Sequence, residues 1–173
     1  MIDKRMQDAI NDQINAEIYS AYLYYAMVYY FDDKNLTGFA KWMRVQALEE
    51  MTHAHKLAAY VSERGGRPVM TAIDGPDNDW ESPLAVAEAV YKHECHVSAR
   101  INKLVDLARE LSDHATYNML QWFVGEQVEE EASADEVVQK LKLVEGQGQG
   151  LFMIDQELGQ RMFTPPVWLA GVF

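Results

Sequence analysis

The chain has almost no cysteine and no surplus of positive charge. Its 173 residues include one cysteine, Cys95, so an internal disulfide is excluded, and so are the paired-cysteine zinc and iron–sulfur sites. A lone thiol fits a reducing compartment. Lysine and arginine number 15 against 27 aspartates and glutamates, which gives a net charge of −12. Proteins that hold a phosphate backbone carry a basic surface, so we expect no direct binding to nucleic acid.

Long hydrophobic runs are also missing. The longest nearly unbroken apolar stretch covers residues 167–173, whereas a membrane-spanning helix needs about 20 residues. The first residues enter a charged amphipathic pattern without the basic start and apolar stretch of an export leader. We therefore expect no membrane association and a cytoplasmic location. The hydrophobic fraction of 49% is nevertheless typical of a chain that folds around a core.

Turn residues divide the chain into long helical stretches, and no strand-like alternation lies between them. The breaks at 32–35 and 112–113 are short, whereas the 17 residues from Gly65 to Glu81 are rich in glycine, proline and aspartate. Two short connections imply two antiparallel helix pairs, and the long one predicts an all-α, four-helix bundle with one long crossover. Ser82 followed by Pro83 predicts the start of the third helix, since serine caps free amides and proline suits the first helical position.

The last part of the chain is assigned to the same domain as the bundle. Residues 1–145 form the four-helix bundle in this assignment, and residues 146–173 form a short fifth C-terminal helix with an apolar tail. Three glycines in the stretch GQGQG (residues 146–150) break the chain after the fourth helix. The fifth helix is expected at Leu151–Met162, and two consecutive prolines end it.

Steps of three and four residues trace one apolar stripe along each bundle helix, and polar residues interrupt every stripe near its middle. The interruptions are Glu17 in the first helix, Glu50 and His53 in the second, Glu94 in the third, and Gln127 and Glu130 in the fourth. Antiparallel helices of similar length bring their middles to one level. We therefore expect these residues to converge at the centre of the bundle.

Carboxylates that face one another in an apolar interior need positive charge beside them, because a buried unpaired charge is costly. The stripes hold no lysine or arginine at that level, so we expect two divalent cations. Carboxylate oxygens with one imidazole favour iron or manganese, and we expect iron. Glu50 is placed to bridge the two ions, because His53 can complete one ion while Glu94 and Glu130 face the other.

A second acidic group lies one position off the stripes. Glu49, Glu126 and Glu129, together with Glu130, can hold a third ion. A solvated helix face is the alternative interpretation of these glutamates, and both stay open. The fourth helix departs from the Glu-x-x-His pattern of di-iron bundles, since Gln127 stands at its first position and Glu130 at the histidine position. One metal position is therefore expected to be weaker, which suits an ion that passes through.

Three stretches together resemble the non-haem bacterial ferritins, namely residues 46–54 (QALEEMTHA), 91–94 (YKHE) and 120–131 (LQWFVGEQVEEE). The resemblance runs over nearly the whole chain, including the crossover and the fifth helix. It implies a ferritin-like fold and a protein that oxidises ferrous iron with oxygen or peroxide. It also implies that the mineral is stored inside a homo-oligomeric shell of 24 subunits. No haem is expected.

The resemblance implies roles for individual residues as well. The implied iron ligands and their neighbours are Glu17, Glu50 and His53 at the first position, Glu50, Glu94 and Glu130 at the second with Gln127 beside it, and Glu49, Glu126, Glu129 and Glu130 at a third. Tyr24 and Trp122 are similar to the redox-active aromatic residues near the centre in this family.

Two other functions stay open at this point. Met51 stands where a haem-containing bacterioferritin carries its haem-ligating methionine, so a haem-dependent iron store is one alternative. A structural helical bundle with a vestigial metal site is the other, and anaerobic iron titration separates it from an enzyme. The tyrosine-rich first helix and the apolar tail leave more hydrophobic surface than a soluble monomer tolerates, so we expect a closed homo-oligomer.

Overall fold

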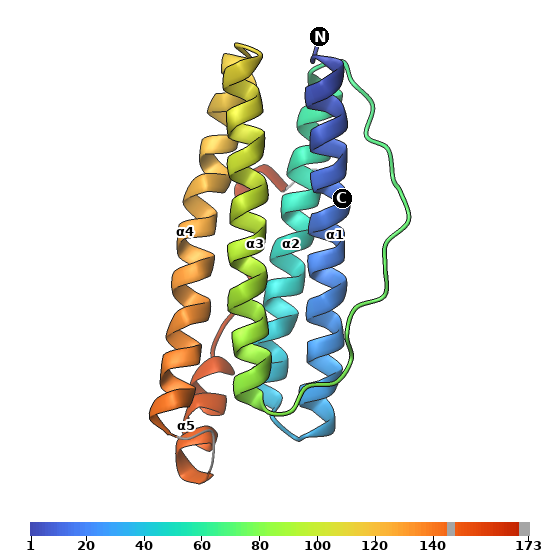
Figure 1. The fold of residues 1–173 in the computed structure, drawn as a ribbon. Coiled ribbons are helices and arrows are strands. Elements are labelled where there is room, and N and C mark those ends of the chain that lie inside the picture. The colour runs from blue at the N-terminus through green and yellow to red at the C-terminus, as the bar shows by residue number, and fades with distance from the viewer. Residues whose placement is uncertain (145–147, 170–173) are drawn as a thin grey trace.

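The structure is a computed structural model that describes residues 1–144 and 148–169. Four long helices form an antiparallel bundle, and a fifth, short helix lies at one end of it (Figure 1). The helices are α1 (Lys4–Asp33), α2 (Thr37–Glu63), α3 (Pro83–Glu110), α4 (His114–Leu143) and α5 (Gly148–Leu158), with a 3-10 turn at Val167–Leu169. No strand occurs in the described residues. The predicted all-α bundle with one crossover and a short fifth helix is confirmed.

Short polar residues set the helix starts and the hairpin turns. The Ser82 hydroxyl accepts a hydrogen bond from the amide of Ala85 and Pro83 is the first residue of α3, as the sequence predicts. The α1–α2 and α3–α4 turns contain Asn35 and Ser112, with φ of 58° and 54°. This left-handed conformation reverses the chain within a few residues, so each helix pair is a tight antiparallel hairpin.

The crossover between α2 and α3 runs the length of the bundle along α1 (Figure 1). Two asparagines of α1 fasten it there. The side chain of Asn15 donates to the Thr71 hydroxyl at 2.7 Å and to the Ala72 carbonyl at 2.9 Å, and the Asn11 side-chain oxygen accepts from the Val69 amide at 3.2 Å. Side-chain hydrogen bonds replace secondary structure in this segment, and they cover one face of α1.

The apolar core consists of two clusters, one toward each end of the bundle. One contains Tyr24, Phe31 and Phe39, and the other contains Leu57 and Leu120. The predicted stripe residues are buried, except for the last residues of the second and third stripes, Tyr60 and Leu111, which are only partly covered. The polar interruptions of the stripes are buried between the two clusters, so the centre of the bundle is a polar layer with apolar packing above and below.

The fifth helix differs from the sequence expectation at both ends. It begins at Gly148 instead of Leu151 and ends at Leu158 instead of Met162. Gly150 lies within α5 and does not break it. A Cβ at this position would lie 2.5 Å from the Cβ of Val144. The role of this glycine is close packing. The expected division between bundle and tail at 145/146 lies outside the described residues.

The segment after α5 follows α2 along its length. The ammonium group of Lys41 donates to the carbonyl of Gly159 at 2.8 Å, Arg161 pairs with Glu49 further along α2, and Trp168 packs on Lys56 beyond that. The predicted apolar tail therefore contacts the bundle through Trp168, and residues 170–173 lie outside the described part. Within the described residues, no helix has the length and apolarity that crossing a membrane requires.

Candidate metal centre

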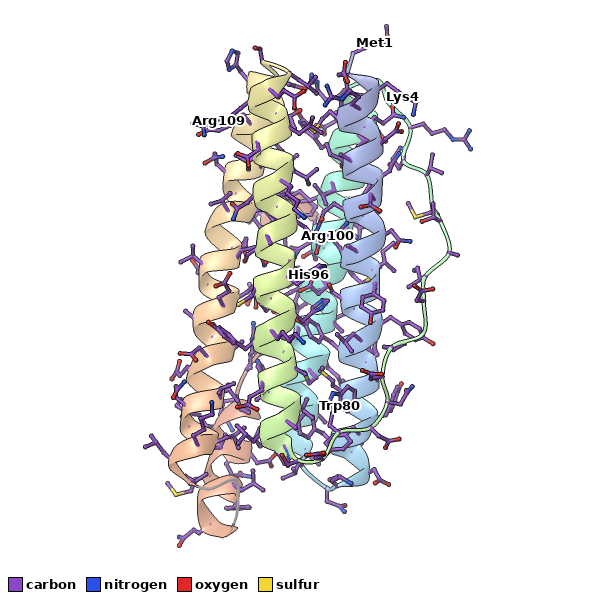
Figure 2. All side chains as sticks on the ribbon, in the orientation of Figure 1. Met1, Lys4, Trp80, His96, Arg100 and Arg109 are labelled. Atoms are coloured by element: carbon purple, nitrogen blue, oxygen red, sulfur yellow. The ribbon has the colours of Figure 1, made fainter. Side chains whose placement is uncertain are left out.

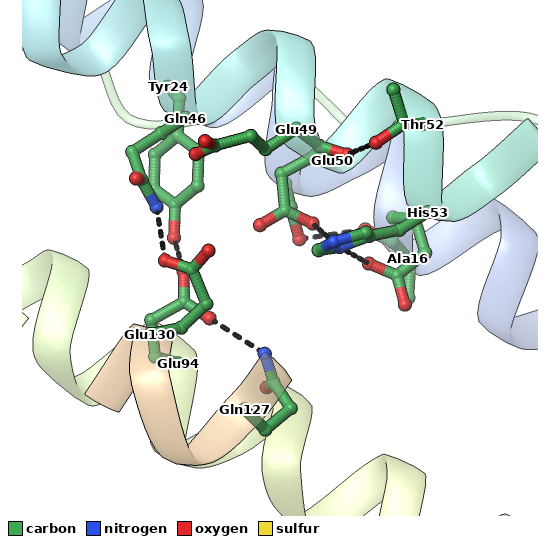
Figure 3. A network of polar contacts seen from close by, with 12 residues as sticks. Ala16, Tyr24, Gln46, Glu49, Glu50, Thr52, His53, Glu94, Gln127 and Glu130 are labelled. Atoms are coloured by element: carbon green, nitrogen blue, oxygen red, sulfur yellow. Dashed lines mark hydrogen bonds and ion pairs between the residues drawn. The ribbon is translucent and has the colours of Figure 1, made fainter. Parts of the chain in front are cut away.

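Glu17 of α1 and Glu50 and His53 of α2 meet at the middle of the bundle. The Nδ1 atom of His53 lies 3.8 Å from Glu17 Oε2 and 3.5 Å from Glu50 Oε2. One ligand atom from each of the three residues falls within 4.8 Å of the others. All three side chains are buried. Figure 3 shows Glu50 and His53 directed toward the same central space.

Several oxygen atoms in this group have no hydrogen-bond donor. Glu17 Oε2 and both carboxylate oxygens of Glu50 are buried without a hydrogen-bond partner among the described residues. A buried charged oxygen without a donor is costly. A divalent cation bound by these atoms would remove that cost, so the residues present fit a metal site.

The electrostatics of the three side chains are those of a carboxylate pair that shares one positive charge. Burial alone would raise the pKa of Glu17, but His53, together with hydrogen bonds to Glu50 and Gln13, more than offsets this and lowers the pKa. Burial, together with the charges of Glu94 and Glu17, raises the pKa of Glu50 well above its ordinary value. Burial opposes charge on His53, but both carboxylates raise its pKa well above the usual range. A proton on His53 thus supplies the positive charge that a metal ion would bring.

Glu94 of α3 reaches the same space from the opposite side of the bundle. The Tyr24 hydroxyl of α1 donates a hydrogen bond to Glu94 Oε1, and the Gln127 amide of α4 donates to Glu94 Oε2 at 3.4 Å (Figure 3). Burial, then the charge of Glu130, raises the pKa of Glu94 to about 7. Burial and the charge of Glu94 also raise the pKa of Tyr24 well above 10, so the phenol keeps its proton at neutral pH.

Glu130 of α4 completes the polar layer. Its Oε2 atom accepts a hydrogen bond from the Gln46 amide of α2 at 2.7 Å (Figure 3). The charge of Glu130 raises the pKa of Glu94, and the charge of Glu94 raises the pKa of Glu50, so these carboxylates act on one another across the polar layer. Among the described residues, however, only Glu17, Glu50 and His53 form a group of three ligand atoms within 4.8 Å. Hydrogen bonds to Tyr24 and Gln46 hold the other two carboxylates instead.

A glutamine that the sequence reasoning missed holds Glu17. Gln13, one turn before Glu17 on α1, is buried and donates to Glu17 Oε1 at 2.8 Å. Arg100 of α3 donates to the Gln13 side-chain oxygen at 2.9 Å, and Figure 2 shows Arg100 at mid-height of the bundle. Because the arginine can only donate, it fixes the amide so that its NH₂ group faces Glu17. A glutamine four residues before a stripe glutamate was the available signal.

A second arginine and glutamine hold Glu130 in the same way. Arg161, in the segment after α5, donates to the side-chain oxygen of Gln46, and Gln46 donates to Glu130. In each case the glutamine donates to one carboxylate oxygen, Glu17 Oε1 or Glu130 Oε2, and the other oxygen of that glutamate does not take part in the bond. Neither arginine lies on a bundle stripe, which is why the stripes alone predict no positive charge near the centre.

The three glutamates predicted for a third ion are not equivalent. Glu49 is largely buried and its Oε2 atom lies 2.7 Å from Arg161 Nη2, whereas Glu126 is half-buried and Glu129 is exposed. Burial raises the pKa of Glu49 to about 7 even though Arg161 opposes this. Burial also raises the pKa of Glu126. Within the described residues these glutamates form no trio as close as Glu17, Glu50 and His53.

Trp122 of α4 packs beside the first trio. Its ring meets the His53 imidazole edge to face, with ring centroids 5.5 Å apart. The Lys56 ammonium group lies 4.3 Å from the Trp122 ring centroid and 4.7 Å from that of Trp168, a cation–π arrangement that links α4 to the C-terminal segment. The predicted aromatic residues Tyr24 and Trp122 therefore contact opposite sides of the polar centre, through Glu94 and His53 respectively.

Comparisons with known proteins show the family to which the chain belongs. The family model for the ferritin-like domain matches residues 7–144. The chain belongs to the ferritin family. A bacterial non-heme ferritin of Bacteroides fragilis strain 638R is 46% identical over 161 residues, which cover 93% of this chain and all of that protein. One of Escherichia coli O6:H1 is 35% identical over 158 residues, or 91% of this chain and 96% of that protein.

Solved ferritin structures share the fold over almost the full length. An Archaeoglobus fulgidus ferritin engineered into a closed form superposes with a TM-score of 0.93 and 53% identity, covering 95% of this chain and all of that one. A structure described as an open pore ferritin from the same organism gives a TM-score of 0.92 and 52% identity, with 94% and 100% coverage. Membership of the ferritin family supports iron storage, and the Glu17, Glu50 and His53 cluster is a possible metal site.

Proposed function

We propose that this ferritin oxidises ferrous iron at a dinuclear centre inside each bundle and stores the ferric product within a shell of 24 subunits. The observation that carries the proposal is the group of donor-less oxygens on Glu17 and Glu50 beside His53 at the buried centre of the bundle. Four carboxylates at one level match the charge of two divalent ions. Family membership supports iron as the metal.

Two iron positions follow from the arrangement of the side chains. Glu17 and His53 lie on one side of Glu50, and Glu94 lies on the other, close enough to affect its ionisation. We assign the first ion to Glu17, Glu50 and His53, and the second to Glu50, Glu94 and Glu130. Gln127 stands beside the second position through its hydrogen bond to Glu94. Glu50 is the bridging ligand in this assignment.

Iron and oxygen are the substrates of the proposed reaction. Two ferrous ions give two electrons to one dioxygen molecule, which takes up two protons and leaves as hydrogen peroxide, while both ions become ferric. The apolar clusters above and below the centre limit water access to the site. The Tyr24 phenol, held against Glu94, orients that carboxylate toward the second ion.

The surface of α1 supports the homo-oligomer. Tyr22, Tyr25 and Tyr29 are spaced by three and four residues, which places them on one face of the helix, and 52%, 36% and 68% of their respective surfaces are exposed. An exposed aromatic stripe of this kind is typical of a protein–protein interface. Under this proposal the partner is a second copy of the chain.

Anaerobic titration of the metal-free protein with ferrous iron, followed by exposure to air, tests the proposed function. We expect two tightly bound ions per chain and rapid oxidation in stopped-flow absorbance. Light scattering at neutral pH should give about 475 kDa, which is 24 chains of 19.8 kDa. A chain that binds no ferrous iron would support the structural bundle instead, and a monomer or dimer would refute the shell.

A further inference from the structure

Arg161 places a positive charge against the glutamate on which a third ion would depend. Its Nη2 atom lies 2.7 Å from Glu49 Oε2, and its Nη1 atom donates to the side-chain oxygen of Gln46. The side chains of Arg161 and Glu49 are 28% and 26% exposed. The guanidinium group is therefore largely buried between α2 and the C-terminal segment.

The backbone around Arg161 is fastened to α2, so the guanidinium position is built into the fold. The Asp155 carboxylate accepts hydrogen bonds from the backbone amides of Gly38 and Phe39 at 2.8 and 3.0 Å. Lys41 then binds the carbonyl of Gly159 at 2.8 Å, and the Arg161 amide donates to the Leu158 carbonyl at 3.1 Å. These bonds hold the backbone of Arg161 close to α2, so that its side chain contacts Glu49 and Gln46.

A guanidinium group in this place competes with a metal ion in two ways. It takes one oxygen of Glu49 in a charge-assisted hydrogen bond, and it repels a second cation at close range. The remaining glutamates, Glu126 half-buried and Glu129 exposed, are more hydrated, and the ammonium group of Lys56 acts on Glu126 as well. A third ion at these glutamates would therefore be repelled by two positively charged side chains, Arg161 and Lys56.

We propose that Arg161 is a built-in competitor for a third divalent cation at Glu49, so that this chain binds a third ion only when the guanidinium group leaves. The inference rests on the proposed dinuclear centre and concerns an ion in addition to it. It makes the C-terminal segment a determinant of how many ions each bundle holds. The side-chain hydrogen bonds and ion pairs of Arg161 go to Gln46 and Glu49 and not to Glu17, Glu50 or His53, so the first ion provides an internal reference.

Calorimetric titration of the assembled, metal-free protein with Co²⁺ tests the competition. We expect Arg161→Met to bind a third Co²⁺ at least tenfold more tightly than the parent, because Glu49 is released. The conservative variant Arg161→Lys keeps the charge and should behave like the parent. Glu49→Gln combined with Arg161→Met should lose the gain. A purely structural role of Arg161 predicts the opposite, since a disturbed segment weakens binding.

A crystal structure of the parent protein in saturating Co²⁺ provides a second test that needs no substitution. We expect a third ion at Glu49 only in subunits where Arg161 has moved away. A third ion at Glu49 with Arg161 still in contact, or an unchanged third affinity in Arg161→Met, would overturn this inference alone. Loss of the two tighter ions from the parent protein would instead overturn the dinuclear centre, and this inference with it.

Discussion

Gly38 and Asp155 are 117 positions apart in the chain, and the Gly38 amide donates to the Asp155 carboxylate at 2.8 Å. The backbones also touch, since a Cβ on Gly38 would lie 1.7 Å from the Asp155 carbonyl oxygen. Asp155 thus caps the start of α2, where free amides and the helix dipole favour an anion. This contact docks α5 on α2 and sets the position of the segment that carries Arg161.

Gly38→Ala should be severely destabilising. The new methyl group cannot be accommodated without moving backbone, so we expect a loss of about 3 kcal/mol or detachment of α5. Gly125→Ala is the matched control, because a Cβ at this α4 position meets nothing within 4 Å. Alanine there should stabilise the helix by about 1 kcal/mol. Chemical denaturation of both variants measures the difference, and equal stabilities would contradict the close contact.

The breaks between the four bundle helices and the buried stripes could be predicted because they depend on local signals. Ser82 and Pro83 mark the start of α3 by their own chemistry, and burial in a bundle imposes a period of about 3.6 residues. The stripe positions of Glu17, Glu50 and His53 follow from that period. Their convergence follows from helix lengths and short turns, so this part of the candidate site needed no knowledge of distant contacts.

The parts that the sequence did not predict depend on contacts between distant segments. Arg100 reaches Gln13 from another helix, and Arg161 reaches Glu49 from beyond α5. The hydrophobic periodicity of a helix gives no information about which residues of distant segments form such pairs. Gly150 misled the prediction for a related reason, since a glycine that breaks a helix and a glycine that packs against Val144 look the same in sequence.

The bond between Gln13 and Glu17 should contribute to the stability of the metal-free protein. Gln13→Leu leaves Glu17 Oε1 and the Arg100 side chain without this partner, so we expect a loss of about 1–3 kcal/mol. Arg100→Met should cost less, because Asp12, its other partner, is exposed. The double variant should deviate from additivity by about 0.5 kcal/mol or more. Strictly additive losses in denaturant titrations would show that the pair does not act as a unit.

Asp113 at the start of α4 should make stability depend on pH. Its carboxylate accepts from the Thr116 amide at 3.1 Å and from Arg64 at 3.0 and 3.2 Å. Burial would raise its pKa, but Arg64 and Thr116 more than offset this and lower it. A depressed pKa stabilises the fold above the ordinary aspartate value of about 4 and loses this contribution as the pH falls further.

Asp113→Asn isolates the charge, because asparagine is an equally good helix cap. At pH 7 we expect the variant to lose about 1 kcal/mol relative to the parent. The difference should stay constant down to about pH 5 and shrink below about pH 4, where the parent carboxylate takes up a proton. Urea denaturation of both proteins from pH 3 to 8 measures this, and a difference that is independent of pH would exclude the ion pair as its source.

The bridging assignment predicts unequal effects of Glu50→Ala and Glu130→Ala on ferrous oxidation. In this assignment Glu50 is shared by both ions, with His53 at one and Glu94 at the other, so its loss removes a ligand from both ions. Glu130→Ala removes a ligand from the second ion alone. We expect the initial stopped-flow rate of Glu50→Ala to be about tenfold or more below that of Glu130→Ala, which corresponds to about 1.4 kcal/mol in the barrier.

Glu131→Ala provides the control for a charge lost from the same turn of α4. Glu131 accepts a hydrogen bond from Ser98 and has no place in either proposed iron position, so its removal should leave the initial rate near that of the parent. Light scattering of the three variants should show that each one still assembles. A common residual rate in Glu50→Ala and Glu130→Ala would mean that each ion needs both glutamates equally, and Glu50 would then have no special role between them.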